Sequence, residues 1–293
     1  YKRQNLNFNE TALKNLMNTI ASDNNRKITQ LSSGYSSFGP DLGSDKLSLI
    51  SPPRISVLTE GNSSAYNAGE IIHFFEKQLG YNANYVSESR LNNDVLSKTD
   101  ILILPSGYYN FNSIKNDLIN WIRKGGTLIA LSRALDALSE IDSFKISIKE
   151  SSKSDKPDME PNSSRRRKYI SNLITGSIYK AKIDQSHPIG YGYDDYYYTL
   201  KLSGNAYELL DNQNIAYIES DIKPHSGFAG SNVSSKQGNS LLFGNQNLGQ
   251  GNIVYMVDNP LFRAFWENGK LFFANAIFFS GNRNYKDLEW FTT

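Results

Sequence analysis

The sequence predicts an α/β fold in which helices cover both faces of a doubly wound, mainly parallel sheet. Apolar runs of strand length, such as ISVLTE at 55–60, DILILPSG at 100–107 and TLIALS at 127–132, alternate with helical segments. Strands that are apolar on both faces are typical of parallel sheets, because the crossover helices bury both sides. The 293 residues are enough for one such domain with a substantial core.

Helix and turn signals place the elements of the first half in order. Apolar residues at helical spacing predict a helix at 10–22, and a short strand is expected at 27–33. The double proline Pro52-Pro53 then marks a boundary. The alternating elements expected after it are strand 55–60, helix 65–79 ending at Gly80, strand 82–89, helix 90–98, strand 100–107, helix 111–126 and strand 127–132.

The second half predicts an extension of the sheet. Residues 150–168 are polar and contain prolines and mixed charge runs, including Arg165-Arg166-Arg167-Lys168, so we expect a mobile, exposed insertion there. Strand-like segments at 177–184, 195–202, 214–220, 239–244 and 252–258 suit mixed or antiparallel additions, and an apolar helix is expected at 269–281.

The predicted fold class is therefore α/β, a flavodoxin-like doubly wound, mainly parallel sheet with antiparallel additions. We divide the chain into an N-terminal helix-strand segment and linker at 1–52, the α/β domain at 53–281 and a tail at 282–293.

The composition excludes several classes of function. With 31 basic and 29 acidic residues the chain is nearly neutral, so neither nucleic acid nor an anionic membrane is an expected partner. Cysteine is absent, which excludes disulfides, thiolate metal sites and a cysteine nucleophile. The sequence contains no apolar run of about 18 residues, so no membrane-spanning helix is predicted. Abundant aromatic and few charged residues favour a secreted or periplasmic protein, whose signal peptide would lie outside this chain.

A zinc site is the first candidate for chemistry. His73 and Glu76 form the pattern H-x-x-E, which places both side chains on one face of a helix, and His187 is a possible third ligand. The two helix residues lie between Ile71, Ile72, Phe74 and Phe75, with no turn to bring a substrate close. We therefore favour an ordinary helix face and expect no metal or other cofactor in this chain.

Nucleophilic hydrolysis is the second candidate. Ser132 follows an apolar strand at the position of a strand-to-helix elbow, and His187 could act as its base. The neighbours of Ser132 include no glycine to relieve the strain of an elbow. We therefore interpret Ser132 as the N-cap of the next helix, and the His187-Pro188 step as structural.

The carboxyl ends of the strands are where such sheets bind ligands, so we expect a pocket there. Its candidate residues are Glu60, Asn62, Ser63, Ser64, Ser106, Ser132 and Asn259. The loop GNSSAYNAG could hold an anion on Ser63 or Ser64, although it matches no phosphate-binding motif, and Ser64 suits a helix cap. With residues 106–110 and the run Tyr196–Tyr198, these loops could also form a carbohydrate- or peptide-binding surface.

Several blocks together resemble a known family. SGYSSFGPDLGS, PPRISVLTEGNSSAYNAGEIIHFFE, ILILPSG, WIRKGGTLIAL, IDQSHPIGYGY and DNPLFRAFWENGKLFFANAIFF look like the C-terminal region of large bacterial zinc carboxypeptidase-family proteins. This resemblance implies a secreted metallopeptidase domain upstream, which holds the zinc, followed by a class I glutamine amidotransferase-like domain. The metal-binding H-x-x-E of the family belongs to that upstream domain.

The resemblance also implies that catalysis is lost here. A working glutaminase needs an elbow cysteine and a histidine after a late strand, whereas this chain has Ser132 and Asn259 in those regions. We expect a non-catalytic accessory domain that braces the peptidase domain, binds part of its peptide substrate or mediates a homodimer, so that any hydrolase label describes the parent protein. The alternatives are a hydrolase through Ser132 and His187 or through His73, Glu76 and His187, and a carbohydrate- or peptide-binding module.

Overall fold

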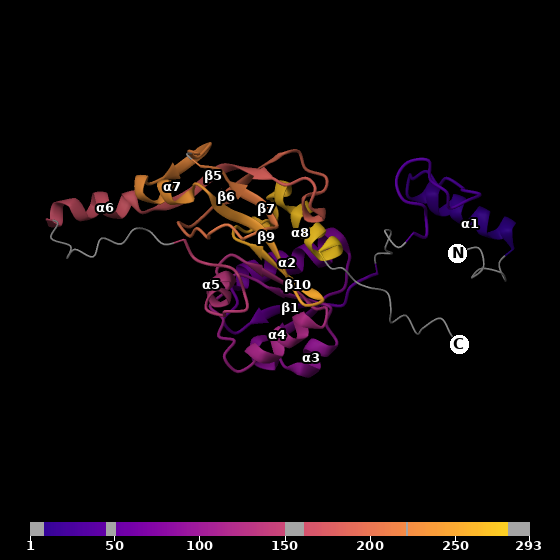
Figure 1. Ribbon diagram of the computed structural model, residues 1–293, viewed down its shortest axis with the longest axis horizontal. Coiled ribbons are helices and arrows are strands. Elements are labelled where there is room, and N and C mark those ends of the chain that lie inside the picture. Colours follow the sequence, from indigo (N-terminus) through magenta and orange to yellow (C-terminus); the bar gives the residue numbers. More distant parts are fainter. Residues whose placement is uncertain (1–8, 45–50, 150–160, 221, 281–293) are drawn as a thin grey trace. The chain divides into compact units, whose positions relative to one another are not determined.

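The computed structural model describes residues 9–44, 51–149, 161–220 and 222–280 (Figure 1). The chain forms two compact units, residues 1–49 and 50–293. The first contains helix α1 (Glu10–Asp23), as predicted, and the Asn9 side chain caps it by accepting a hydrogen bond from the Thr11 amide at 3.0 Å. The prediction of a strand at 27–33 was wrong, and these residues form neither helix nor strand. The described part of this unit offers no second strand with which they could pair.

The second unit is built on one sheet, whose strand order within the described residues is β2-β1-β3-β4-β10-β9-β7-β5-β6, with β8 paired to β5. The first five strands are parallel, and the others are antiparallel to their neighbours. The parallel part has the flavodoxin-like order in which the chain reverses direction across the sheet between β1 and β3. The predicted fold class, including the antiparallel additions, is confirmed.

The bounds of the strands are β1 Ile55–Glu60, β2 Asn84–Ser87, β3 Ile101–Leu104, β4 Thr127–Leu131, β5 Ile174–Ile183, β6 Tyr196–Lys201, β7 Asn214–Ile218, β8 Ser226–Ala229, β9 Ser240–Leu248 and β10 Gly251–Met256. The α-helices of this unit are α2 Ala65–His73, α3 Asn93–Ser97, α4 Lys115–Arg123, α5 Ala134–Ser139, α6 Arg165–Ser171, α7 Ser231–Gln237 and α8 Glu267–Phe279. Shorter helical turns are η2 Phe74–Leu79, η3 Glu88–Arg90, η4 Asn162–Ser164, η5 Pro188–Gly190 and η6 Phe262–Ala264.

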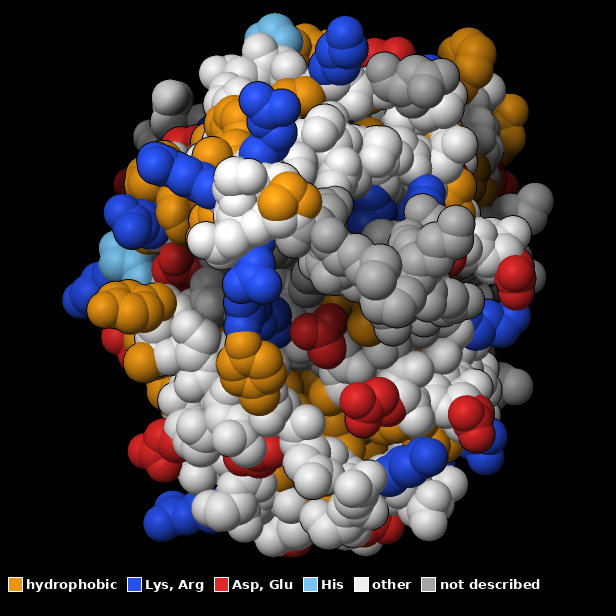
Figure 2. Space-filling view, turned by 90° about the vertical axis from the view of Figure 1, so that its left-hand side faces the viewer, with side chains coloured by type: hydrophobic (Ala, Val, Ile, Leu, Met, Phe, Trp, Pro, Cys, Tyr) orange, Lys and Arg blue, Asp and Glu red, His pale blue; other side chains and the backbone are white. Residues whose placement is uncertain are grey.

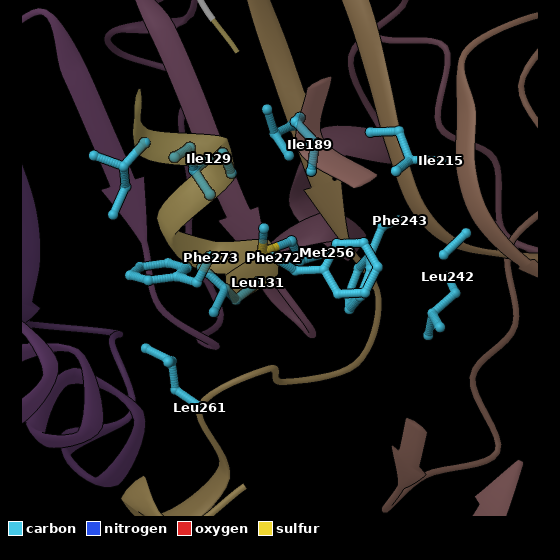
Figure 3. Close-up of a cluster of buried hydrophobic side chains, with 14 of the residues drawn as sticks. Ile129, Leu131, Ile189, Ile215, Leu242, Phe243, Met256, Leu261, Phe272 and Phe273 are labelled. Atoms are coloured by element: carbon cyan, nitrogen blue, oxygen red, sulfur yellow. The ribbon is translucent and has the colours of Figure 1, made fainter. Parts of the chain in front are cut away.

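Two hydrophobic clusters lie on opposite faces of the sheet. One contains side chains of α2 and α8, including Phe272 and Phe273, which lie between strands β4 and β10 and the turn η5 (Figure 3). The other contains buried side chains of α3, α4 and α5. Burial on both faces explains why β3 and β4 consist of apolar residues.

Helix α2 continues as a π-helical segment, η2, up to Gly80, which adopts a φ of 64° and ends the helix as predicted. Phe74 and Phe75 are both buried there, and their rings lie 5.3 and 6.2 Å from the ring of Phe273. The helix is thereby fixed against α8, and its opposite side is available to line a cleft.

The exposed insertion predicted at 150–168 is partly different in the structure. Residues 150–160 lie outside the described residues, as does the predicted tail at 282–293. The remainder, with the basic cluster, forms η4 and helix α6 instead of a loop. Strand β8 and helix α7 were not predicted, because SGFA is only four residues long and SNVSSKQ contains a single apolar residue. No helix in the described ranges is long and apolar enough to cross a membrane.

Candidate functional site

A cleft of about 750 Å³ opens at the carboxyl ends of the parallel strands. Its walls come from one side of α2 along its whole length, the turn after β3, the turn after β4, the loop after β10 and strand β6 with the segment after it. This is the edge at which doubly wound sheets bind their ligands, since the loops of several strands meet there.

Backbone strain is concentrated at this cleft. Ser132, Arg263 and Ala264 have φ angles of 51°, 49° and 58°, and all three line the cleft. They are three of the six non-glycine residues with positive φ in the described part of the chain. A left-handed backbone is unfavourable for such residues and persists where the surrounding structure imposes it, which is common at functional sites.

The geometry at Ser132 corrects our interpretation of this residue. Ser132 does not cap α5, whose N-cap position is held by Arg133 without a side-chain hydrogen bond. It forms instead a sharp elbow, and its amide donates to the carbonyl of Met256 at 2.7 Å. Among the described residues the Ser132 hydroxyl has no hydrogen-bond partner, so the elbow exists without glycine and without a base beside its oxygen.

Glu70 of α2 connects one wall of the cleft to another. Its carboxylate accepts hydrogen bonds from the Asn259 side-chain amide at 2.5 Å and from the Arg263 backbone amide at 2.6 Å. The Asn67 amide donates to the same carboxylate at 2.9 Å. Because the oxygen of Asn259 also accepts from the Leu261 amide, both polar groups of Asn259 are used in holding the loop after β10.

A buried ion pair lies beneath the cleft. Lys201, whose side chain is 1% exposed, lies 3.1 and 3.2 Å from the two carboxylate oxygens of Asp258. The Thr199 hydroxyl donates to the same carboxylate at 2.7 Å. These contacts satisfy both charges, which a buried pair requires, and they join β6 to the end of β10.

Tyr207, which also lines the cleft, donates its hydroxyl to Asp136 at 2.5 Å. Burial and the hydrogen bond to Asp136 raise the pKa of Tyr207, so the phenol stays protonated and acts as a donor. Helix α5, which follows strand β4, is thereby joined to the wall of the cleft.

Four of the seven predicted pocket residues line the cleft, namely Ser64, Ser106, Ser132 and Asn259. The other three, Glu60, Asn62 and Ser63, do not line it.

Asn62 instead donates its side chain to Glu88 at 3.0 Å, and the Ser63 hydroxyl donates to the carbonyl of Leu58. The loop after β1 is joined to the loop after β3 by the Ser64 amide, which donates to the Ser106 carbonyl at 2.8 Å. Ser64 precedes α2 at its N-cap but makes no capping bond with its side chain.

The rim carries aromatic rings and two arginines. Tyr66 is 88% exposed and lines the cleft, and the guanidinium carbon of Arg133 lies 5.1 Å from the ring centre of Tyr108. In the loop after β10, the guanidinium carbon of Arg263 lies 5.3 Å from the ring centre of Phe262. Figure 2 shows one face of the molecule, on which hydrophobic, basic and acidic side chains are interspersed without a large area of one charge.

The three residues of the possible zinc site do not converge. No group of three His, Asp or Glu side chains in the described ranges is placed to hold a metal ion. His73 lines the cleft, whereas Glu76 interacts with the hydroxyl of Tyr85 on β2. Burial, together with Glu76, raises the pKa of that tyrosine.

His187 is not among the residues that line the cleft, so it is not brought to Ser132. It stands at the N-cap of η5, where its Nδ1 accepts from the Ile189 amide at 3.2 Å. Burial lowers its pKa, although Asp184 acts in the opposite direction. The contact with the Ile189 amide caps the turn η5. The structural role that the His-Pro step indicates stays a prediction.

Sequence reasoning missed most of the polar residues that shape the cleft, including Asn67, Glu70, Arg133, Lys201 and Arg263. Glu70 and Asn259 are 189 residues apart, and no local pattern relates them. One signal was available for Lys201: it alternates with Tyr197 and Thr199 on the inward side of β6, so its burial follows from the period of a strand.

Comparisons with known proteins give likenesses of fold alone. No family model matches the sequence, and no curated protein matches it. The chain is similar in structure to PurLQS from Thermotoga maritima, with a TM-score of 0.49 and 14% identity over 78% of this chain and 98% of that one. A putative ThuA-like protein from Bacteroides uniformis has a TM-score of 0.46 and 12% identity, covering 80% and 94%. A glutamine amidotransferase from Thermotoga maritima has a TM-score of 0.42 and 11% identity, covering 72% and 77%.

Proposed function

We propose that this chain is a non-catalytic accessory domain whose cleft binds a small polar ligand. The observation that carries the proposal is the state of Asn259. Its side-chain amide cannot act as a general acid or base at neutral pH, and both its polar groups are already used in hydrogen bonds to Glu70 and from Leu261. The cleft thus retains a polar lining and a strained backbone while the position where catalysis would need a base is occupied by a loop contact.

The parent protein is part of the proposal. By the resemblance of its sequence blocks, the chain serves a secreted or periplasmic zinc carboxypeptidase-family protein, with the zinc in an upstream peptidase domain of the same polypeptide. Its partners would be that domain, its peptide substrate or a second copy of the chain. The cleft and its polar lining support a substrate-binding role over a purely bracing one.

Gly69 offers a direct test of ligand binding. It lines the cleft from helix α2, and a Cβ added there meets no atom within 4 Å. Gly69→Leu should therefore fill the cleft without disturbing the helix, which leucine favours more than glycine does. Gln78→Leu, at an exposed position of η2 outside the cleft, is the matched control.

The experiment is an NMR titration of the full chain with glucose, glucuronate, alanyl-alanine and alanyl-alanine amide. We expect at least one of these probes to shift the amide signals of Tyr66 and Ser132 in the native chain and in Gln78→Leu, but not in Gly69→Leu. If none of the four shifts these signals, or if Gly69→Leu binds as the native chain does, the cleft does not bind such ligands and the proposal fails.

Catalysis is tested separately. We expect hydrolysis of acyl esters to equal the buffer background in both the native chain and Ser132→Ala, and zinc to be substoichiometric after dialysis. Ester turnover that Ser132→Ala abolishes, or one bound zinc that His73→Ala removes, would support the hydrolase alternatives. For the accessory role, deletion of this chain from the full polypeptide should lower its peptidase activity.

A further inference from the structure

Two arginines face the cleft with no partner for their charge. Arg133 follows the strained Ser132 in the turn after β4, and Arg263 is itself strained in the loop after β10. Both line the cleft, and within the described chain neither guanidinium has an ion pair or a side-chain hydrogen bond. Two separate loops thus bring a cation each to one hollow.

The acidic groups of the cleft are already engaged. Glu70 accepts hydrogen bonds from Asn67, Asn259 and the Arg263 amide. Asp258 is paired with Lys201 and hydrogen-bonded by Thr199. Lys201 offsets the charge of Asp258, so the other Arg, Asp and Glu side chains that line the cleft are two arginines and one glutamate, Glu70.

Each guanidinium lies over an aromatic ring, Arg133 over Tyr108 and Arg263 over Phe262. The ring contacts the flat face of the guanidinium and limits its movement. The N–H groups at the edge of the guanidinium remain available to a ligand. A planar guanidinium edge matches the two oxygens of a carboxylate, with two parallel hydrogen bonds. The arrangement is therefore suited to carboxylate recognition more than to a neutral hydroxyl group.

We propose that the cleft recognises a ligand through a carboxylate held by Arg133 and Arg263. Ser64, Ser106 and Asn205 supply hydrogen-bonding groups for the rest of the ligand, and the exposed ring of Tyr66 supplies a surface for its apolar part. This inference rests on the proposed binding function and specifies its ligand class. The carboxylate could belong to a peptide C-terminus or to an acidic sugar.

Two pairs of probes differ only in that group. Alanyl-alanine is compared with alanyl-alanine amide, and glucuronate with glucose, by NMR titration of the full chain. We expect one acid to bind at least about tenfold more tightly than its neutral counterpart, since hydrogen bonds between charged groups are the stronger ones. The pair that shows the difference identifies the source of the carboxylate.

The variants Arg133→Gln and Arg263→Gln should each weaken binding of that acid by about tenfold. Arg263→Lys should not restore it, because an ammonium lacks the two-pronged edge. Arg90→Gln, which removes an exposed arginine outside the cleft, is the control and should bind as the native chain does. Circular dichroism and thermal unfolding of each variant verify that it is folded.

Three results would overturn the inference: neither acid binds, an acid binds no better than its neutral counterpart, or both glutamine variants keep the native affinity. A neutral probe that binds the native chain as tightly as its acidic counterpart, but does not bind Gly69→Leu, would overturn the carboxylate inference alone. It would leave the proposed binding function standing, so the two failures are distinguishable.

Discussion

The side-chain amide of Asn259 donates a 2.5 Å hydrogen bond to the carboxylate of Glu70 and so joins the loop after β10 to helix α2. Replacing Glu70 with alanine would leave Asn259, Asn67 and the Arg263 amide without their acceptor. We expect Glu70→Ala to lower the free energy of unfolding by about 1–3 kcal/mol, measured by urea denaturation. Glu140→Ala, at an exposed glutamate that follows helix α5, should change it by about 0.5 kcal/mol or less. Equal effects of the two variants would show that the Glu70 contacts are not stabilising.

The ion pair of Lys201 and Asp258 gives a second prediction. Lys201→Met would leave a carboxylate that is largely buried with only Thr199 as a partner, so we expect a loss of about 3–5 kcal/mol in the free energy of unfolding. The double variant Lys201→Met with Asp258→Asn removes both charges and should be more stable than Lys201→Met alone. Denaturant titration of the four proteins of this cycle measures the coupling, and additive effects would contradict the pairing.

The strained backbone at Ser132 gives a third prediction. Glycine adopts a φ of 51° at no steric cost. Ser132→Gly should therefore raise the free energy of unfolding by about 1 kcal/mol, and with it the melting temperature. Ser132→Val should lower it, because a β-branched residue is strongly disfavoured there. Ser139→Gly, at the last residue of helix α5, where the backbone is helical, serves as the control and should be destabilising by up to about 1 kcal/mol. A loss of stability in Ser132→Gly comparable with that in Ser139→Gly would argue against strain at the elbow.

The pH dependence of stability tests the environment of His187. Burial lowers its pKa in the folded state, so the unfolded chain binds the proton more readily. The contribution of neutral His187 to the free energy of unfolding is therefore complete above the unfolded-state pKa of about 6.5. It is lost as the pH falls through that value toward the folded-state pKa. His187→Asn keeps an N-cap acceptor without titrating.

We expect the native chain to lose more stability than His187→Asn between about pH 7 and pH 5, measured by urea denaturation at each pH. Asp184 opposes the effect of burial on the pKa of His187. Asp184→Asn should therefore lose more stability than the native chain over the same pH range. Parallel pH profiles for native chain and His187→Asn would mean that His187 titrates alike in both states.

The parallel half of the fold could be predicted from the sequence because its strands are buried on both faces. β3 and β4 consist of apolar residues, and helix α2 ends at a glycine with positive φ, which are local signals. β8 gave no such signal, since it has only four residues and none of them is fully buried. The strand expected at 27–33 shows the converse error, in which a strand-like composition finds no partner to pair with.

The cleft was predictable in its place but not in its chemistry. Its position follows from the order of parallel strands, and Ser64, Ser106, Ser132 and Asn259 were found in this way. The roles of Glu70 and Lys201 depend on contacts with residues 189 and 57 positions away, which a single sequence does not reveal. The elbow at Ser132 was misread because the strain there is imposed by the surrounding structure and not encoded by a glycine.

Strand β10, the last of the sheet in chain order, lies at its centre, between β4 and β9. The parallel strands made earlier and the antiparallel strands that follow them are therefore joined only when residues 251–256 are in place. Contacts of such large sequence separation slow folding, and during synthesis they leave the edges of β4 and β9 unpaired until residues 251–256 have left the ribosome. This chain should accordingly depend on chaperones more than a fold whose central strands are made first, and truncation within β10 should yield insoluble protein and not a smaller folded domain.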